Sequence, residues 1–192
     1  IAPDAELEPV VELCSAHGAS EAADAPRPIY DAIVGGWTRD ALARGYELGH
    51  VASGDGHDGH PGLTHLGPQY GIGGVTAILA DSPQRGSVLA ALRARRTYAT
   101  SGPRVLLRFA VGSAPMGTEL TVDPSGSSEQ LFVSYAGTAR VSEVNVIRSD
   151  AAPLSFAGGG RTELEISGAL DGLRPGGWVY VTRGLVVLLN SE

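Results

Sequence analysis

Short apolar runs separated by turn residues make up the first half of the chain. The run at residues 10–13 predicts a short buried strand that ends at Cys14-Ser15, and residues 46–53 and 74–80 predict two more strands. Thr38 is expected to cap a short helix from Arg39 to Arg44, with Gly45 as its stop. Alternation of helix and strand of this kind predicts an α/β fold.

A second predicted helix follows residues 74–80. Ser82 is expected to cap it and Pro83 fits its first turn, while Val88, Leu89 and Leu92 form an apolar stripe at helical spacing. Packing against a sheet explains such a stripe without any further function.

The pattern changes after Gly102-Pro103. Five short β-prone runs follow, separated by Gly, Pro, Ser and Asp: VLLRFAV, LFVSYAG, EVNVIRS, TELEIS and WVYVTR. Such spacing predicts an antiparallel sandwich or small barrel. We therefore expect two domains, an α/β domain over residues 1–103 and an all-β, sandwich-like domain over residues 104–192.

Composition and charge narrow the function classes. The 192 residues carry a formal net charge of -7, and all 14 basic residues are Arg. An acidic chain without a basic stripe is a poor nucleic-acid binder, and no apolar stretch is long enough to span a bilayer. The expected partner is therefore neither nucleic acid nor membrane. The chain begins with Ile1, which suggests a fragment or a processed chain, so compartment and oligomeric state stay open.

Four of the five histidines fall within residues 50–65, and none follows. Within the loop SGDGHDGHPG, Asp55 and His57 stand two residues apart after a predicted strand, so their side chains are expected on the same side of an extended segment. A carboxylate and an imidazole together suit Zn, Mn or Fe, and we predict such a divalent metal site here. A solvated glycine-rich turn is the alternative.

A second candidate patch lies at residues 11–21. Glu12 and His17 are each possible ligands, whereas Cys14 is expected to be a small buried residue rather than a nucleophile. Arg27 or Arg104 is a candidate for binding a substrate oxyanion.

Several motifs occur in one order: VVELCSAHGASE, RDALARGYELGHVASGDGHDGHPG, GGVTAILA, VLAALRARRTYATSGPRVLLRF and APMGTEL. Together they resemble the DUF3604 group of uncharacterised proteins, related to the PHP (polymerase and histidinol phosphatase) superfamily, over roughly residues 9–120. The resemblance implies a distorted α/β barrel holding two or three metal ions that hydrolyses phosphoesters with a metal-activated water. Asp55 and His57 match the last ligand pair of the family, and Glu12 and His17 are candidates for its upstream ligands. His17 is also a candidate proton donor to the leaving group.

The sequence departs from the family pattern at its start. No H-x-H motif precedes Glu12, so we expect the first part of the barrel to be missing and the chain to be the C-terminal portion of a metal-dependent phosphoesterase acting on a small molecule. Two other readings stay open: a catalytically inactive β-rich binding or structural fragment, and an amidohydrolase-like enzyme that uses the same metals.

Overall fold

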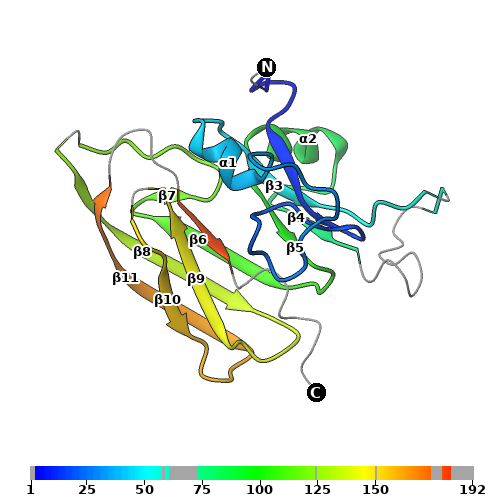
Figure 1. Cartoon of the computed structure of the whole chain (residues 1–192). Coiled ribbons are helices and arrows are strands. Elements are labelled where there is room, and N and C mark those ends of the chain that lie inside the picture. Colours follow the sequence, from blue (N-terminus) through cyan, green and yellow to red (C-terminus); the bar gives the residue numbers. More distant parts are fainter. Residues whose placement is uncertain are drawn as a thin grey trace. The chain divides into compact units, whose positions relative to one another are not determined.

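The computed structural model divides the chain into two compact units, residues 1–104 and 105–192. Figure 1 shows the helices and strands of both units. The residues that the structure describes are 3–57, 59–60, 73–123, 125–149, 151–173 and 179–182. His65, one of the histidines of residues 50–65, lies outside them.

Unit 1 contains a three-stranded sheet in the order β2-β1-β3. Strand β1 (Val10–Ser15) turns directly into β2 (Gly18–Ala19), with Ser15 opposite Gly18 in an antiparallel pair. Strand β3 (Gly49–Ala52) runs parallel to β1, with Val10 opposite Gly49. Because β1 and β3 are parallel, their C-terminal ends meet at the same edge of the sheet.

Helix α1 (Thr38–Ala43) lies between β2 and β3 in the chain. Its N-cap is Trp37, one residue before the predicted Thr38, and the Asp40 carboxylate accepts a hydrogen bond from the Trp37 N–H at 3.0 Å. An acidic side chain suits this position because the first turn of a helix has free N–H groups. Gly45, at φ +82°, follows the helix as predicted.

The other described strands of unit 1 are an antiparallel pair, β4 (Val75–Ile78) and β5 (Thr97–Thr100), which are joined through helix α2 (Arg85–Arg93). Helix α2 begins after Gln84, two residues later than the predicted Ser82 cap. Two threonine hydroxyls connect this pair to β3. Thr76 Oγ1 donates to Ala52 O at 2.6 Å and accepts from Ala52 N at 2.8 Å, and Thr97 Oγ1 donates to His50 O at 2.8 Å.

The described residues of unit 2 form two antiparallel sheets. One has the order β11-β8-β6-β7, from β6 (Leu106–Val111), β7 (Ala114–Pro115), β8 (Ser127–Ala136) and β11 (Glu163–Leu173). The other has the order β10-β9-β12, from β9 (Glu143–Arg148), β10 (Leu154–Ala157) and β12 (Val179–Thr182).

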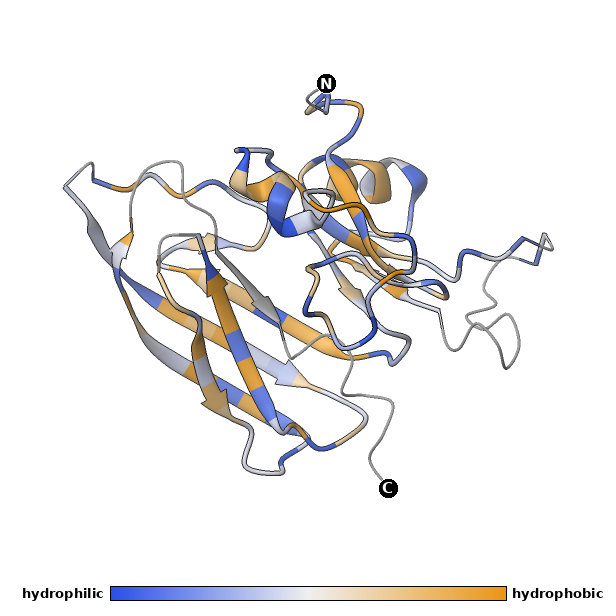
Figure 2. Ribbon diagram, in the orientation of Figure 1, coloured by the Kyte–Doolittle hydropathy of each residue, from blue (hydrophilic) through white to orange (hydrophobic). Residues whose placement is uncertain are grey.

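The core of unit 2 draws side chains from both sheets. Leu131, Val133 and Leu170 from one sheet and Val144 and Val146 from the other are all almost fully buried in one cluster. Apolar and polar residues alternate along β9 and its neighbours (Figure 2) because successive side chains of a strand point to opposite faces. With such alternation, the apolar side chains of a strand lie on the buried face of the sheet and the polar side chains lie on the other face.

The predicted α/β barrel is wrong: the described residues form small, mostly antiparallel sheets with two short helices and no barrel. The pair β1–β3 is parallel, but β4 and β5 on either side of α2 are antiparallel, so the β-α-β unit of β1, α1 and β3 does not repeat. The protein is β-rich. Neither helix in the described part of the chain has the length and apolar character needed to cross a membrane.

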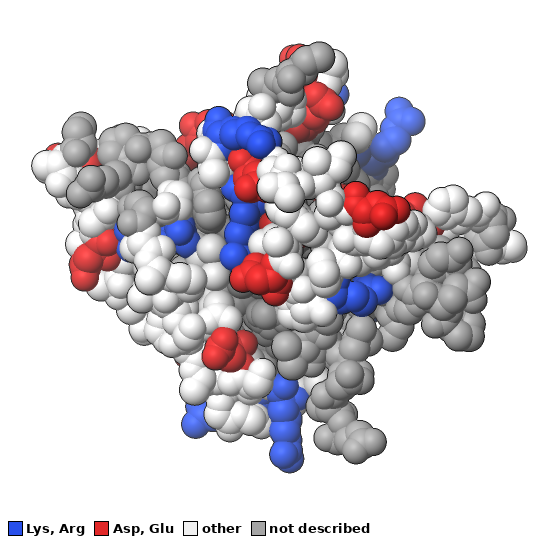
Figure 3. All heavy atoms as spheres, in the orientation of Figure 1, with Lys and Arg blue, Asp and Glu red and all other residues white. Residues whose placement is uncertain are grey.

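Acidic and basic residues are interspersed on the face drawn in Figure 3. Within unit 1 several of these charges form pairs, such as Arg39 with Glu21 at 2.7 Å and Arg95 with Glu47 at 3.2 Å. Glu21 is buried, so its pairing with Arg39 compensates for the loss of water around its carboxylate.

Candidate metal site

His17 occupies the tight turn between β1 and β2. Ser15 and Gly18 pair across this turn, which leaves Ala16 and His17 as its two central residues. The Ser15 hydroxyl accepts a hydrogen bond from the His17 N–H at 3.2 Å. The turn therefore places the imidazole at the C-terminal end of β1, and its side chain is 15% exposed.

Asp55 and His57 belong to the loop that leaves β3, at the same edge of the sheet. Ser53 fixes the start of this loop: its N–H donates to Cys14 O at 3.1 Å, and its carbonyl accepts from Gly74 N at 2.7 Å. The Ser53 hydroxyl also accepts from the Asp55 N–H at 3.2 Å. Backbone hydrogen bonds to two other segments therefore fix the position of the loop just before Asp55.

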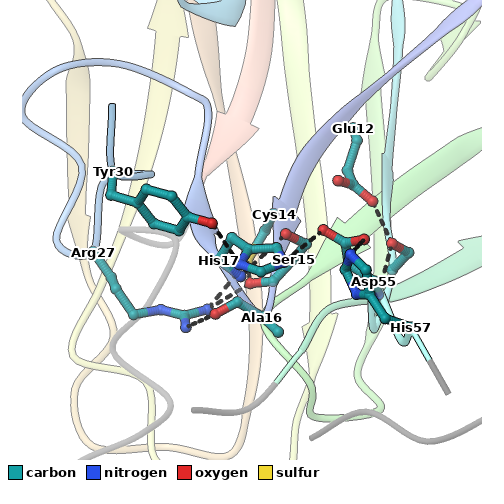
Figure 4. Close-up of polar contacts among 10 residues, drawn as sticks. Glu12, Cys14, Ser15, Ala16, His17, Arg27, Tyr30, Asp55 and His57 are labelled. Carbon is teal, nitrogen blue, oxygen red and sulfur yellow. Dashed lines mark hydrogen bonds and ion pairs between the residues drawn. The ribbon is translucent and has the colours of Figure 1, made fainter. Parts of the chain in front are cut away.

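Asp55 adopts a left-handed backbone conformation, with φ of +51°. The segment is thus not extended at Asp55, contrary to the geometry expected for the Asp55-x-His57 spacing. Asp tolerates this region better than most residues because its short polar side chain forms local hydrogen bonds. The turn at Asp55 nevertheless leaves the Asp55 and His57 side chains facing one another (Figure 4).

The three side chains form one cluster (Figure 4). Asp55 Oδ2 lies 3.1 Å from His17 Nε2, and Asp55 Oδ1 lies 4.0 Å from His57 Nε2. The two imidazole rings meet edge to face, with centroids 5.7 Å apart. One ligand atom from each residue lies within 4.8 Å of the others.

The donor set fits a divalent transition metal ion. Two imidazole nitrogens and a carboxylate oxygen are ligands that Zn, Mn and Fe accept. Metal–ligand bonds of about 2.1 Å would bring the donors to roughly 3–4 Å from one another, so the cluster needs to contract only slightly. Two neutral imidazoles and one carboxylate together carry a single negative charge. A bound divalent cation would therefore give the site a net positive charge.

Glu12 stands apart from these three residues. Its carboxylate accepts a short hydrogen bond from the Ser53 hydroxyl, and its side chain is exposed. Glu12 thus contacts the residue that begins the loop of Asp55 and His57. Its role as a metal ligand stays a prediction.

The two arginines proposed for substrate binding have different surroundings. The Arg27 guanidinium donates to Ala16 O at 3.1 Å and to Ser15 O at 2.9 Å, so it holds the turn that carries His17. Arg104 is exposed at the last position of unit 1. Binding of a substrate oxyanion by either residue stays a prediction.

Cys14 of β1 and His50 of β3 are both uncharged at neutral pH. Burial raises the pKa of the Cys14 thiol, although the neighbouring Arg27 lowers it. A protonated thiol is a weak nucleophile, which agrees with Cys14 being a packing residue. Burial also lowers the pKa of His50 to about 4, opposed by the charge of Glu21, so His50 is neutral at pH 7.

Sequence reasoning missed Tyr30. Its hydroxyl lies 3.2 Å from His17 Nδ1, and the two rings meet edge to face with centroids 5.6 Å apart. Tyr30 lies in a segment rich in Pro and Ala without apolar periodicity, so no pattern pointed to its contact with His17.

Comparison with known proteins adds a family match. Residues 57–125 match the model of the DUF3604 family, described as a protein of unknown function. The matched segment begins at His57 and therefore includes one residue of the cluster, and it continues into unit 2. No solved structure matches the chain.

Three similar proteins come from chlamydiae, and all are described as uncharacterised. Those from Chlamydia muridarum and Chlamydia trachomatis are 36% and 35% identical over 156 residues, which is 76% of this chain and 25% of each relative. The protein from Chlamydia pneumoniae is 37% identical over 157 residues, 75% of this chain and 25% of the relative. The chain thus spans about a quarter of the length of the curated relatives it matches.

Proposed function

We propose that His17, Asp55 and His57 hold a divalent metal ion, Zn, Mn or Fe, in a hydrolase that acts on small phosphoesters. The observation that carries this proposal is the convergence of three ligand atoms, from two separate segments, within 4.8 Å of one another. A site with three protein ligands leaves a position for water, as in catalytic zinc sites. The relation to the PHP superfamily, inferred from the order of the sequence motifs, is part of the same proposal.

The chemistry follows from the charge of the cluster. A divalent cation bound here would lower the pKa of its water ligand toward about 7. It would also place a positive charge next to that water. The single negative charge of Asp55 leaves the loaded site with an excess of positive charge. Such a site attracts an anionic phosphoryl oxygen and stabilises the charge that develops as water attacks.

The exposure of the residues agrees with access for a substrate. The side chain of His57 is 71% exposed and that of Asp55 is 39% exposed, whereas that of His17 is 15% exposed. His17 thus supports the site from the sheet edge. Asp55 and His57 form its open side, where a phosphoester could approach.

A second candidate function rests on the contact between His17 and Asp55. At 3.1 Å the His17 imidazole and the Asp55 carboxylate are within hydrogen-bond distance of one another without a metal. A pair with a purely structural role would have the same geometry. The chain would then be a β-rich binding or structural module without a metal.

Metal analysis of the purified chain separates the two functions. We expect Zn, Mn or Fe near one equivalent in the wild-type chain, and loss of the metal in the Asp55→Ala, His57→Ala double variant. His60→Ala is the matched control, because His60 belongs to the same loop but not to the cluster. A wild-type chain that stays metal-free after exposure to all three ions would rule the metal site out.

The substrate class needs a second assay. The metal-loaded chain should hydrolyse phosphoesters in preference to carboxylic esters and amides, with the double variant as the blank. Preferential amide hydrolysis would favour an amidohydrolase-like enzyme instead.

A further inference from the structure

The two ring nitrogens of His17 have different neighbours. Nε2 faces Asp55 Oδ2 at 3.1 Å and points into the cluster, whereas Nδ1 faces the Tyr30 hydroxyl at 3.2 Å (Figure 4). The Tyr30 ring also packs edge to face on the imidazole, at an interplanar angle of 77°. The orientation of the His17 ring is therefore defined at both of its nitrogens.

Tyr30 is 62% exposed, yet the segment that carries it is held by backbone hydrogen bonds. Ala19 N donates to Arg27 O at 2.7 Å, and Ile29 N donates to Ala19 O at 2.9 Å. These bonds form a parallel bridge between Ala19 and Pro28. The segment thus extends the edge of β2 and delivers Tyr30 to the side of His17.

Gly18 makes this approach possible. An added Cβ at Gly18 would lie 2.7 Å from both the N and the Cα of Ile29, and the backbone there has φ of +134°. Both the close approach and the conformation require glycine. The Tyr30 segment therefore crosses the His17 turn at a residue that has no Cβ.

We propose that Tyr30 is a positioning residue of His17, whose hydroxyl holds Nδ1 and so keeps Nε2 directed toward Asp55 and the cluster. This inference rests on the proposed metal site. A neutral imidazole binds a metal through its unprotonated nitrogen while its other N–H donates to an acceptor. The tyrosine hydroxyl is both donor and acceptor, so it can pair with Nδ1 in either state.

The proton on His17 is expected to move when metal binds. In the metal-free chain Nε2–H donates to Asp55, and the Tyr30 hydroxyl donates to Nδ1. When Nε2 binds the metal, the proton is on Nδ1 and the Tyr30 oxygen accepts it. The number of protons on the imidazole is the same in both states, so the change is an exchange of tautomers.

The test uses the 192-residue chain labelled with ¹⁵N, in wild-type, Tyr30→Phe and Tyr46→Phe forms. Long-range ¹H–¹⁵N spectra at one fixed pH report which His17 nitrogen is protonated, before and after titration with Zn²⁺. We expect Nε2–H without Zn²⁺ and Nδ1–H with it in the wild-type chain. Tyr30→Phe should keep Nε2–H without the metal, since Asp55 still accepts it, but should move the Nδ1 chemical shift and bind Zn²⁺ about 10- to 100-fold more weakly.

A control variant and two possible results distinguish the inference about Tyr30 from the proposed metal site. Tyr46→Phe removes a hydroxyl elsewhere in unit 1 and should behave as wild type in both measurements. If Tyr30→Phe has the wild-type Nδ1 chemical shift and Zn²⁺ affinity, the inference is overturned. If the wild-type chain binds no Zn²⁺, the proposed function fails, and the Nδ1 shifts of the metal-free chains alone then decide whether Tyr30 holds His17 at Nδ1.

Discussion

Asp55 Oδ2 lies 3.1 Å from His17 Nε2, although one residue sits in the turn after β1 and the other in the loop after β3. The parallel pairing of β1 with β3 causes this contact, because it brings the C-terminal ends of both strands to one edge. Sheet edges of this kind are where α/β proteins build their sites. Here the same geometry arises in a β-rich unit from a single parallel pair.

Asp55→Asn should separate the charge of the site from its shape. Asn keeps the size of the side chain and tolerates the left-handed backbone at this position, so the stability of the metal-free chain should change little. The variant should lose the stabilisation that metal gives, which is about 2.7 kcal/mol for a ligand at 100 times its Kd. Thermal unfolding with and without Zn²⁺ measures it.

Asp81→Asn is the control for this substitution, since the Asp81 side chain is 86% exposed and lies outside the cluster. Its stabilisation by Zn²⁺ should equal that of the wild-type chain. Full stabilisation of Asp55→Asn by Zn²⁺ would show that the carboxylate is not a ligand.

Part of the candidate site was predictable from the sequence. The density of His and Asp at residues 53–60, after a predicted strand, indicated Asp55 and His57, and the structure brings His17 to them. Tyr30 was not predictable, because its position depends on the bridge between Ala19 and Pro28, which no local pattern encodes. A contact between two irregular segments leaves no periodicity in either of them.

The fold, like the candidate site, was predictable only in part. Both helices and every strand that the sequence predicted lie near their true places, since apolar spacing and turn residues are local signals, whereas β2, β5, β7 and β10 were not predicted. The α/β class was wrong, because one β-α-β rhythm does not determine how the next strands pair. Thr76, whose hydroxyl connects β4 to Ala52 of β3, illustrates a tertiary contact that decides the arrangement.

Gly18→Ala should destabilise unit 1 and disturb the site together. The new Cβ meets the Ile29 backbone, and the positive φ is strained for any other residue, so we expect a loss of about 2 kcal/mol or more. Urea unfolding, followed by Trp37 fluorescence in a Trp178→Phe background, reports on unit 1. The His17 nitrogen shifts should move in the same variant.

Gly45→Ala serves as the comparison, because Gly45 also has a positive φ but nothing lies within 4 Å of an added Cβ. It should cost about 1 kcal/mol, the conformational strain alone. Equal losses in the two variants would mean that the contact with Ile29 contributes nothing.

Thr76→Val should test whether the hydroxyl bridge to Ala52 holds the edge where the site loop begins. Valine keeps the shape of threonine but leaves both Ala52 backbone groups without this partner, at a cost of about 2 kcal/mol. Thr118→Val, which removes an exposed hydroxyl bonded to Pro115 O, should cost less than about 0.5 kcal/mol. Urea unfolding of the two variants gives the comparison, and a neutral Thr76→Val would contradict the bridge.

His50 should make unit 1 less stable as the pH falls. Its pKa is about 4 in the folded chain against an ordinary value of 6.5, because burial disfavours the charged ring and the charge of Glu21 only partly compensates. Between these two values the unfolded chain binds a proton that the folded chain does not. The stabilisation is therefore complete above about pH 6.5, is lost progressively toward pH 4, and amounts to roughly 3 kcal/mol.

His50→Gln provides the reference for this titration. Gln does not ionise, so the free energy of unfolding of the variant should fall less steeply than that of the wild-type chain between pH 6.5 and pH 4. Subtracting the two curves, each from urea unfolding at a series of pH values, removes the titration of the carboxylates that both chains share. Parallel curves would show that His50 is charged in the folded chain or hydrated enough to titrate normally, and its burial in β3 would then not govern the acid stability of unit 1.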